Sequence, residues 1–205
     1  MDTNSVSLRE KVAKEAANLI YTGIEKEFKQ AKLKAAETFG AYFLPTNLEV
    51  ALEIDRLAEE REGSARQERL VKMRQDALIL MHILKEHSPL LIGSVWRGTI
   101  HYASDIDIAV CHNEPADVMD TLRRSGVKLV QAERVTVTKK GKRKGSFHIY
   151  VELLDKEKAE IKVVQSSEAS RKEKCDIYGD QIRGLNIKEL ERMLRENPLQ
   201  RFVPS

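Results

Sequence analysis

The hydrophobic pattern of this 205-residue chain changes its period near residue 88, and this change limits what the chain can fold into. Before that point, apolar residues recur every three or four positions, as they do on one face of an α-helix. After it come short apolar runs and the strict alternation of Asp105–Val110, which are typical of β-strands. The sequence therefore predicts an α+β protein, with a helical N-terminal region followed by a mixed sheet of about five strands flanked by helices.

The N-terminal region is expected to contain three helices. A capping signature, Ser or Thr followed three residues later by Glu, opens helices at Ser7 and Thr46. The first helix should continue to Gly40 and the second to Gly63. A third helix follows and ends before Pro89, because proline disfavours helical geometry in the residue before it.

The elements after residue 88 are shorter, and most of them are strands. Besides a short strand before Gly93 and the alternating segment, strands are expected at 127–138, 147–154 and 159–165, and helices at 115–124 and 187–196. We divide the chain into three parts on this basis. They are a helical region (1–88), a core domain (89–167) and a C-terminal helical tail that docks on the core (168–205).

Composition excludes several classes of protein. With 41% hydrophobic and 33% charged residues, the chain is neither disordered nor a membrane protein, and no apolar run approaches the ~18 residues needed to cross a bilayer. The N-terminus lacks the basic and apolar segments of a signal peptide. Two cysteines make no disulfide framework. A cytoplasmic protein without a membrane partner is expected.

The residues that could take part in binding or catalysis are concentrated between Leu91 and Val110. Gly93 and Ser94 follow a short apolar run. A glycine lets the backbone approach a phosphate closely, and the adjacent N–H groups and the serine hydroxyl can donate hydrogen bonds to its oxygens. Arg97 follows, and its guanidinium is suited to pairing with phosphate.

Asp105 and Asp107 lie two residues apart on an expected strand, so both carboxylates share one face while Ile106 and Ile108 point into the core. Two neighbouring carboxylates repel each other unless a cation lies between them. Hard divalent ions such as Mg²⁺ prefer such oxygen ligands. This pair is therefore a candidate metal site.

The combined pattern resembles the nucleotidyltransferase superfamily, whose fold is shared with DNA polymerase beta. The match consists of Ile92-Gly93-Ser94, ten intervening residues, and then Asp105-Ile106-Asp107-Ile108. Arg97-Gly98 and Ser104 are also typical of the small stand-alone members. The resemblance covers roughly residues 78–165 and does not cover residues 1–64.

The resemblance implies a third acidic residue on a neighbouring strand. In this family the acid lies early in the second strand of a hairpin, between apolar residues. Glu160, between Ala159 and Ile161, fits that position better than Glu152 in the preceding strand. Alternation alone leaves the choice open, because both glutamates fall on the non-core face.

The resemblance further implies nucleotidyl transfer with two metal ions. Asp105, Asp107 and Glu160 would hold two Mg²⁺ ions, with Mn²⁺ as an alternative. Gly93, Ser94 and Arg97 would bind the β- and γ-phosphates of a nucleotide triphosphate such as ATP. An acceptor hydroxyl would attack the α-phosphorus, and pyrophosphate would leave.

A run of basic residues precedes Phe147 and suggests a partner. It comprises Lys139, Lys140, Lys142, Arg143 and Lys144. One interpretation is a solvated hairpin tip. The other is contact with RNA or another polyanionic acceptor.

Two other functions stay open at this point. One is a catalytically silent nucleotide-binding or antitoxin-like protein of the same fold. The other is an RNA-binding module, against which the near-neutral net charge of +3 argues. The acceptor and the base preference also stay open, as does the role of the N-terminal helices, which would form an oligomer interface, a lid or an acceptor platform.

Overall fold

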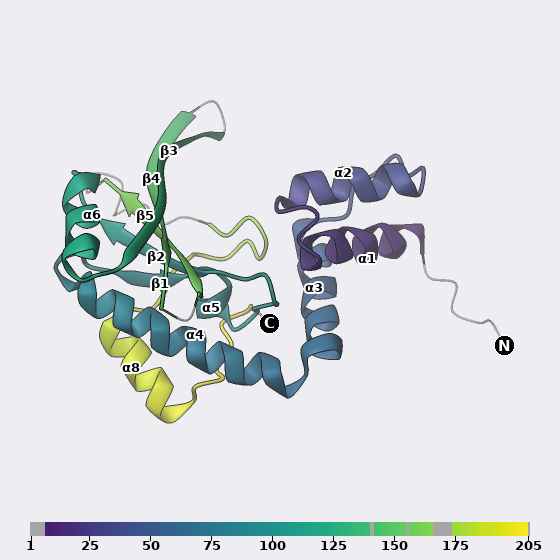
Figure 1. The fold of residues 1–205 in the computed structure, drawn as a ribbon. Helices are drawn as coiled ribbons and strands as arrows, with labels where there is room; N and C mark the ends of the chain where they lie inside the picture. Colours follow the sequence, from purple (N-terminus) through teal and green to yellow (C-terminus); the bar gives the residue numbers. More distant parts are fainter. Residues whose placement is uncertain (1–6, 140–141, 155, 166–173, 205) are drawn as a thin grey trace.

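The protein is built around two hydrophobic cores, and Figure 1 shows the arrangement of the helices and strands that surround them. The computed structural model describes residues 7–139, 142–154, 156–165 and 174–204. One core lies among α1 (Leu8–Tyr21), α2 (Phe28–Thr38) and α3 (Asn47–Glu62), which we call the helical unit. The other joins α4 (Ser64–Ile83), the sheet and α8 (Ile187–Glu196). None of the helices in the described ranges is long and apolar enough to cross a membrane.

The segment before Gly63 contains three helices, whereas the sequence predicts two there. The predicted first helix is in fact two, because the chain turns after Tyr21 and α2 begins only at Phe28. Both helices bury alanines against each other and against α3. The small side chains let the helix axes approach closely, and the apolar spacing continues across the turn. Periodicity alone therefore does not reveal the break.

The boundary between the two cores falls at Gly63, between α3 and α4, and not near residue 88. The capping box of Thr46 and Glu49 opens α3, as expected. The apolar face of α4 packs on the sheet and not on the helical unit. Its buried residues include Leu70, Met73, Ala77, Leu80 and Met81.

The sheet is mixed and has five strands among the described residues, as the sequence predicts, and their order is β1-β2-β5-β4-β3. The strands are β1 (Leu90–Ile92), β2 (Ile106–Cys111), β3 (Lys128–Lys139), β4 (Lys142–Glu152) and β5 (Lys158–Val164). The shorter helical segments are η1 (Lys85–His87), α5 (Gly93–Arg97) and α6 (Pro115–Arg124). Of the strands that the structure describes, only β2 and β5 pair in parallel, and the other neighbours are antiparallel.

The parallel pairing of β2 and β5 positions the polar residues of the sheet. Because both strands begin at the same edge, Asp107 on β2 lies in register with Glu160 on β5. Side chains alternate along a strand, so Ile106 and Ile108 enter the core. Asp107 and Glu160 therefore share the opposite face.

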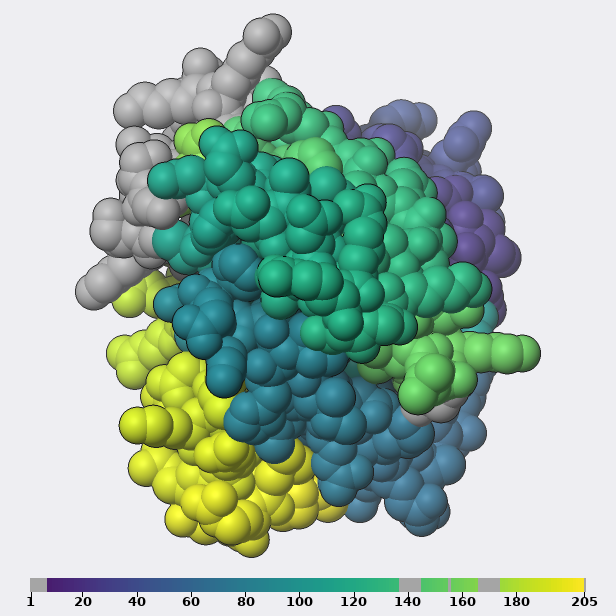
Figure 2. Space-filling model, turned by 60° about the vertical axis from the view of Figure 1, so that its left-hand side comes forward, coloured from purple at the N-terminus to yellow at the C-terminus, as the bar shows by residue number. Residues whose placement is uncertain are grey.

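A buried arginine of α4 joins this helix to the C-terminal segment, by which we mean the residues after α8. The C-terminal part of the chain lies beside α4 (Figure 2). Arg74 is fully buried, and its guanidinium donates hydrogen bonds to four backbone carbonyls. These belong to Val95, Trp96, Pro198 and Gln200, at N···O distances of 3.0, 3.0, 2.6 and 2.8 Å. Burial lowers the pKa of Arg74 to about 10.

We expect Arg74→Met to lower the free energy of unfolding by at least about 3 kcal/mol, because it leaves several buried carbonyls without a donor. Arg56→Met is the matched control. Arg56 is half exposed and forms ion pairs with Glu53 and Glu60 on the surface of α3, so its loss should cost less than about 1 kcal/mol. Urea denaturation of both variants measures the difference. Equal losses would show that Arg74 does not tie the segments together.

Candidate active site

The two aspartates lie at the start of β2, and their surroundings disfavour negative charge. Asp107 is half-buried within the strand, whereas Asp105 is exposed just before it. Burial raises the pKa of Asp107 to about 7, and the nearby charges of Glu160 and Asp105 add to the effect. Burial also raises the pKa of Asp105. The site therefore holds excess negative charge that a cation would relieve.

Gly93 packs directly against the Asp107 carboxylate. A Cβ atom at position 93 would lie 1.9 Å from Oδ2 of Asp107 and 2.8 Å from its Cγ. Gly93 also has a positive φ of +71°, which disfavours other residues. The pairing of β1 with β2 creates this contact, because Ile92 lies opposite Asp107 and Gly93 follows it. The glycine is therefore required by the aspartate itself, which the sequence alone does not reveal.

The structure places the two candidate third acids differently. Glu160 is the direct register partner of Asp107. Glu152 lies on β4, one strand farther from β2, and forms an ion pair with Lys128 at 2.6 Å. Only Glu160 is thus on a strand adjacent to the aspartates.

The Glu160 carboxylate is held by a histidine. Its Oε1 forms a hydrogen bond with Nδ1 of His148, and Nε2 of the same ring contacts Oγ of Ser146 at 2.6 Å. His148 was not among the predicted site residues. The alternation of β4 offered a signal, since His148 and Tyr150 fall on the non-core face of that strand.

Asp105, Asp107 and Glu160 do not converge as a ready metal cage. Among the described residues, no group of three or more His, Cys, Asp or Glu side chains is arranged to hold a metal ion. One oxygen of Glu160 is also engaged in the hydrogen bond with His148. The donor set nevertheless fits a hard divalent cation in kind, since it offers only carboxylate oxygens around a buried aspartate with a raised pKa.

Arg97 has a structural role that the sequence did not predict. Its side chain is buried, and it donates hydrogen bonds to the Phe202 carbonyl at 2.8 Å and to Asp180 Oδ1 at 2.7 Å. The guanidinium also lies 4.6 Å from the ring centroids of Trp96 and Tyr178. Because it is occupied by these partners, the expected role in phosphate binding is not supported. Arg97 anchors the C-terminal segment to α5.

Two cavities flank the loop that leads into β2. An apolar cavity of about 280 Å³ adjoins Gly93 and Ser94 and is lined in part by Ile20, Ile54 and His101. A polar cavity of about 740 Å³ adjoins Asp105 on the other side of the loop. We call them the apolar cavity and the polar cavity.

The predicted basic run falls largely outside the part of the chain that can be described. Lys140 lies beyond the described residues, as do the side chains of Lys139, Lys142, Arg143 and Lys144. The backbone of β3 continues to Lys139 and that of β4 begins at Lys142, so β4 begins earlier than the expected Phe147. The proposed contact with a polyanion stays a prediction.

Comparison with known proteins finds distant structural similarity. No family model matches the chain, and no curated protein matches it. Crystal structures of Cid1 poly(U) polymerase bound to MgATP and to MgGTP are 16% and 17% identical over 54% of this chain, with TM-scores of 0.33 and 0.32. A cytoplasmic RNA terminal U-transferase is 16% identical over 57% of this chain, with a TM-score of 0.29. The chain covers only 38%, 38% and 34% of these three proteins.

Gly93→Ala should lower the free energy of unfolding by at least about 2 kcal/mol, because the new Cβ collides with Asp107 at a positive φ. Gly126→Ala is the control: Gly126 also has a positive φ, where the chain leaves α6, but nothing lies within 4 Å of its Cβ position. Gly126→Ala should lower the free energy of unfolding by only about 1 kcal/mol. In the Gly93→Ala/Asp107→Ala double variant, part of the loss should be recovered. Strictly additive effects in urea denaturation would contradict the contact.

In metal-free buffer, Asp107→Asn should stabilise the protein by roughly 2–4 kcal/mol at pH 8 and by almost nothing at pH 4. The pKa of Asp107 in the folded protein, about 7, lies above its ordinary value of 3.8. The wild type therefore loses stability as the pH rises through this window, whereas the Asn variant has no carboxyl to ionise.

Urea midpoints at several pH values measure this gain. Asp120→Asn, on the exposed surface of α6, is the control and should change stability by less than about 1 kcal/mol throughout. Addition of Mg²⁺ should reduce the gain of Asp107→Asn at pH 8. A gain that is independent of pH would show that charge burial is not its cause.

Proposed function

We propose that this protein is a nucleotidyltransferase, which moves a nucleoside monophosphate from a nucleotide triphosphate to an acceptor hydroxyl. The proposal rests on the way in which two strands and one glycine bring acidic residues together. The parallel pairing of β2 and β5 brings Glu160 into register with Asp107, two residues after Asp105, while the backbone of Gly93 closes on the Asp107 carboxylate. This arrangement suits phosphoryl chemistry, which needs positioning and charge neutralisation.

The triphosphate would lie along Gly93 and Ser94. Ser94 is half-buried in the first turn of α5 and borders the apolar cavity. Its hydroxyl and the neighbouring backbone N–H groups are hydrogen-bond donors for phosphate oxygens. The apolar cavity would take the base, since Ile20 and Ile54 offer it a surface without charge.

Asp105, Asp107 and Glu160 would hold two Mg²⁺ ions. The ions would supply charge neutralisation for the triphosphate and would lower the pKa of the acceptor hydroxyl. Glu160 would have to turn its carboxylate partly away from His148 to take part. In the reaction, the acceptor hydroxyl loses its proton to water, and its oxygen forms a bond to the α-phosphorus. The bond from that phosphorus to the bridging oxygen breaks, and pyrophosphate leaves with the electron pair.

One observation favours a second candidate function. The hydrogen bond between Glu160 and His148 and the lack of a convergent carboxylate group among the described residues would also suit a protein that binds a nucleotide without turnover. The two functions differ in whether pyrophosphate is released.

The purified protein should release pyrophosphate and transfer label when it is incubated with Mg²⁺, α-labelled nucleotide triphosphates and a mixture of RNA, protein and small-molecule extract. Asp105→Asn, Asp107→Asn and Glu160→Gln should each lower transfer by at least about 100-fold, because each removes charge from the site. Glu152→Gln is the matched control and should retain most of the activity, since Glu152 pairs with Lys128 away from β2.

Two results would contradict the roles proposed for these residues. Loss of transfer in Glu152→Gln with full transfer in Glu160→Gln would mean that Glu152, and not Glu160, is the third acidic residue of the site. Triphosphate binding without pyrophosphate release, with any of the acceptor classes, would favour the silent nucleotide-binding protein.

A further inference from the structure

The polar cavity lies between the helical unit and the sheet, and Asp105 forms part of its wall. The residues that line it come from four places in the chain. They are the turn after α1 (Lys26), the α3–α4 junction (Arg61, Glu62, Ala65, Arg69), the loop before β2 (Tyr102, Ala103, Ser104, Asp105) and the turn between β4 and β5 (Lys156, Glu157, Lys158). The helical unit thus completes a cavity that opens on a proposed catalytic residue.

The lining is charged, with more cations than anions among the described residues. Arg69 is engaged in holding the wall, since it donates to the carbonyls of His101 and Ser104 at 2.9 and 3.0 Å. Lys26, Lys156 and Lys158 are exposed. Small-molecule pockets are lined mainly by apolar side chains. A cavity of this composition is better suited to a polyanion.

An aromatic side chain completes the arrangement. The Tyr102 side chain is 52% exposed and borders the polar cavity. Its ring is fixed from behind, with the Tyr21 ring centroid 5.3 Å away and a hydrogen bond from its hydroxyl to the Thr22 carbonyl at 3.3 Å. Its backbone N–H donates to Glu62 at 3.0 Å. Tyr102 is therefore a rigid, exposed surface on which a base can stack.

We propose that the polar cavity binds the 3′ end of a single-stranded nucleic acid and presents its terminal hydroxyl to Asp105. Single-strand sites combine a positively charged groove with aromatic side chains on which bases stack. Here the lysines would contact phosphates and Tyr102 would stack on a base. The inference rests on the proposed function for its chemistry, because it names the acceptor, but binding itself can be measured without catalysis.

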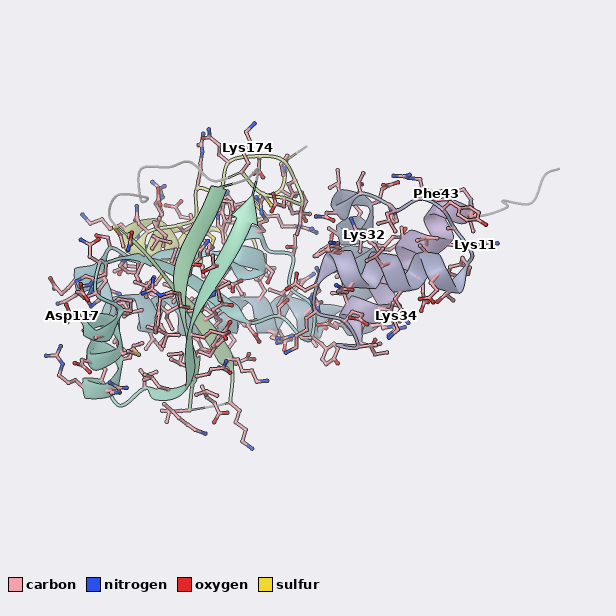
Figure 3. All side chains as sticks on the ribbon, turned by 90° about the horizontal axis from the view of Figure 1, so that it is seen from above. Lys11, Lys32, Lys34, Phe43, Asp117 and Lys174 are labelled. Atoms are coloured by element: carbon pink, nitrogen blue, oxygen red, sulfur yellow. The ribbon has the colours of Figure 1, made fainter. Side chains whose placement is uncertain are left out.

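Binding of a fluorescent single-stranded RNA oligomer, measured by anisotropy without metal or nucleotide, tests the proposal. The Lys26→Gln/Lys156→Gln/Lys158→Gln variant should bind at least about tenfold more weakly at low salt. The slope of its salt dependence should be flatter by about two, because each phosphate that a lysine neutralises on a single strand adds about 0.7 to the slope. The charge-matched control carries Gln at Lys11, Lys85 and Lys188, exposed lysines that do not line the cavity, and Lys11 lies at the outer end of the helical unit (Figure 3). The control should keep the slope of the wild type.

Two further comparisons test the position of the strand. Tyr102→Leu should bind at least about fivefold more weakly than Tyr102→Phe, because only phenylalanine keeps the stacking surface. A circular oligomer of the same sequence has no 3′ end and should bind at least about tenfold more weakly than the linear one. The linear oligomer should be displaced by an excess of unlabelled linear RNA.

Each opposite result overturns the proposal. Equal losses in the two triple variants would mean that the lysines act only through overall charge. Equal binding of circular and linear RNA would show that the polar cavity does not bind the 3′ end. Binding of a nucleoside monophosphate but not of the oligomer would identify a small phosphorylated acceptor instead. These outcomes are separate from a failure of nucleotidyl transfer, which would leave RNA binding in place.

Discussion

The contact between Gly93 and the Asp107 carboxylate is the constraint on which the site depends. It follows from the antiparallel pairing of β1 with β2, which places Ile92 opposite Asp107 and brings the next residue over the carboxylate. A side chain at position 93 would push the aspartate away or break the pairing. The same contact fixes where α5 begins, so the positions of Ser94 and of the apolar cavity depend on it as well.

The placement of Asp105, Asp107 and Glu160 near one another lowers the stability of the folded protein, and perturbed carboxyl groups of this kind are typical of functional sites. Three carboxylates lie near one another at the start of two parallel strands, and burial raises the pKa of Asp107 to about 7. A chain selected for stability alone would gain by a neutral residue at this position. Strongly perturbed carboxyl groups are also found in structural networks, but those are satisfied by arginine or lysine partners. Here Lys162 lowers the pKa of Asp107 and Lys158 and Lys26 lower that of Asp105, but both pKa values stay raised, so a bound cation would further stabilise the ionised carboxylates.

The local parts of this structure were predictable from neighbouring residues, whereas of the tertiary parts only the placement of Glu160 beside the aspartates was expected, through the family resemblance. Capping signatures marked the starts of α1 and α3, and alternation marked the strands, because these signals depend on neighbouring residues. The break between α1 and α2 was missed because the apolar stripe stays in phase across the turn. The role of Arg97 was missed because its partner Asp180 is distant in sequence, and sequence spacing says nothing of such contacts. For the same reason, neither cavity was foreseen.

The loop before β2 contacts both α4 and the helical unit and separates the two cavities. His101 borders the apolar cavity, while Tyr102 and Asp105 border the polar one, so a single short segment forms the wall between them. Its shape is set from α4, where Arg66 and Arg69 donate to loop carbonyls. Burial and these two cations lower the pKa of His101 to about 4, which keeps its ring uncharged beside the apolar cavity. A ligand in either cavity would therefore contact the same loop, and under the proposed function a strand held against Tyr102 would help to fix the position of Asp105.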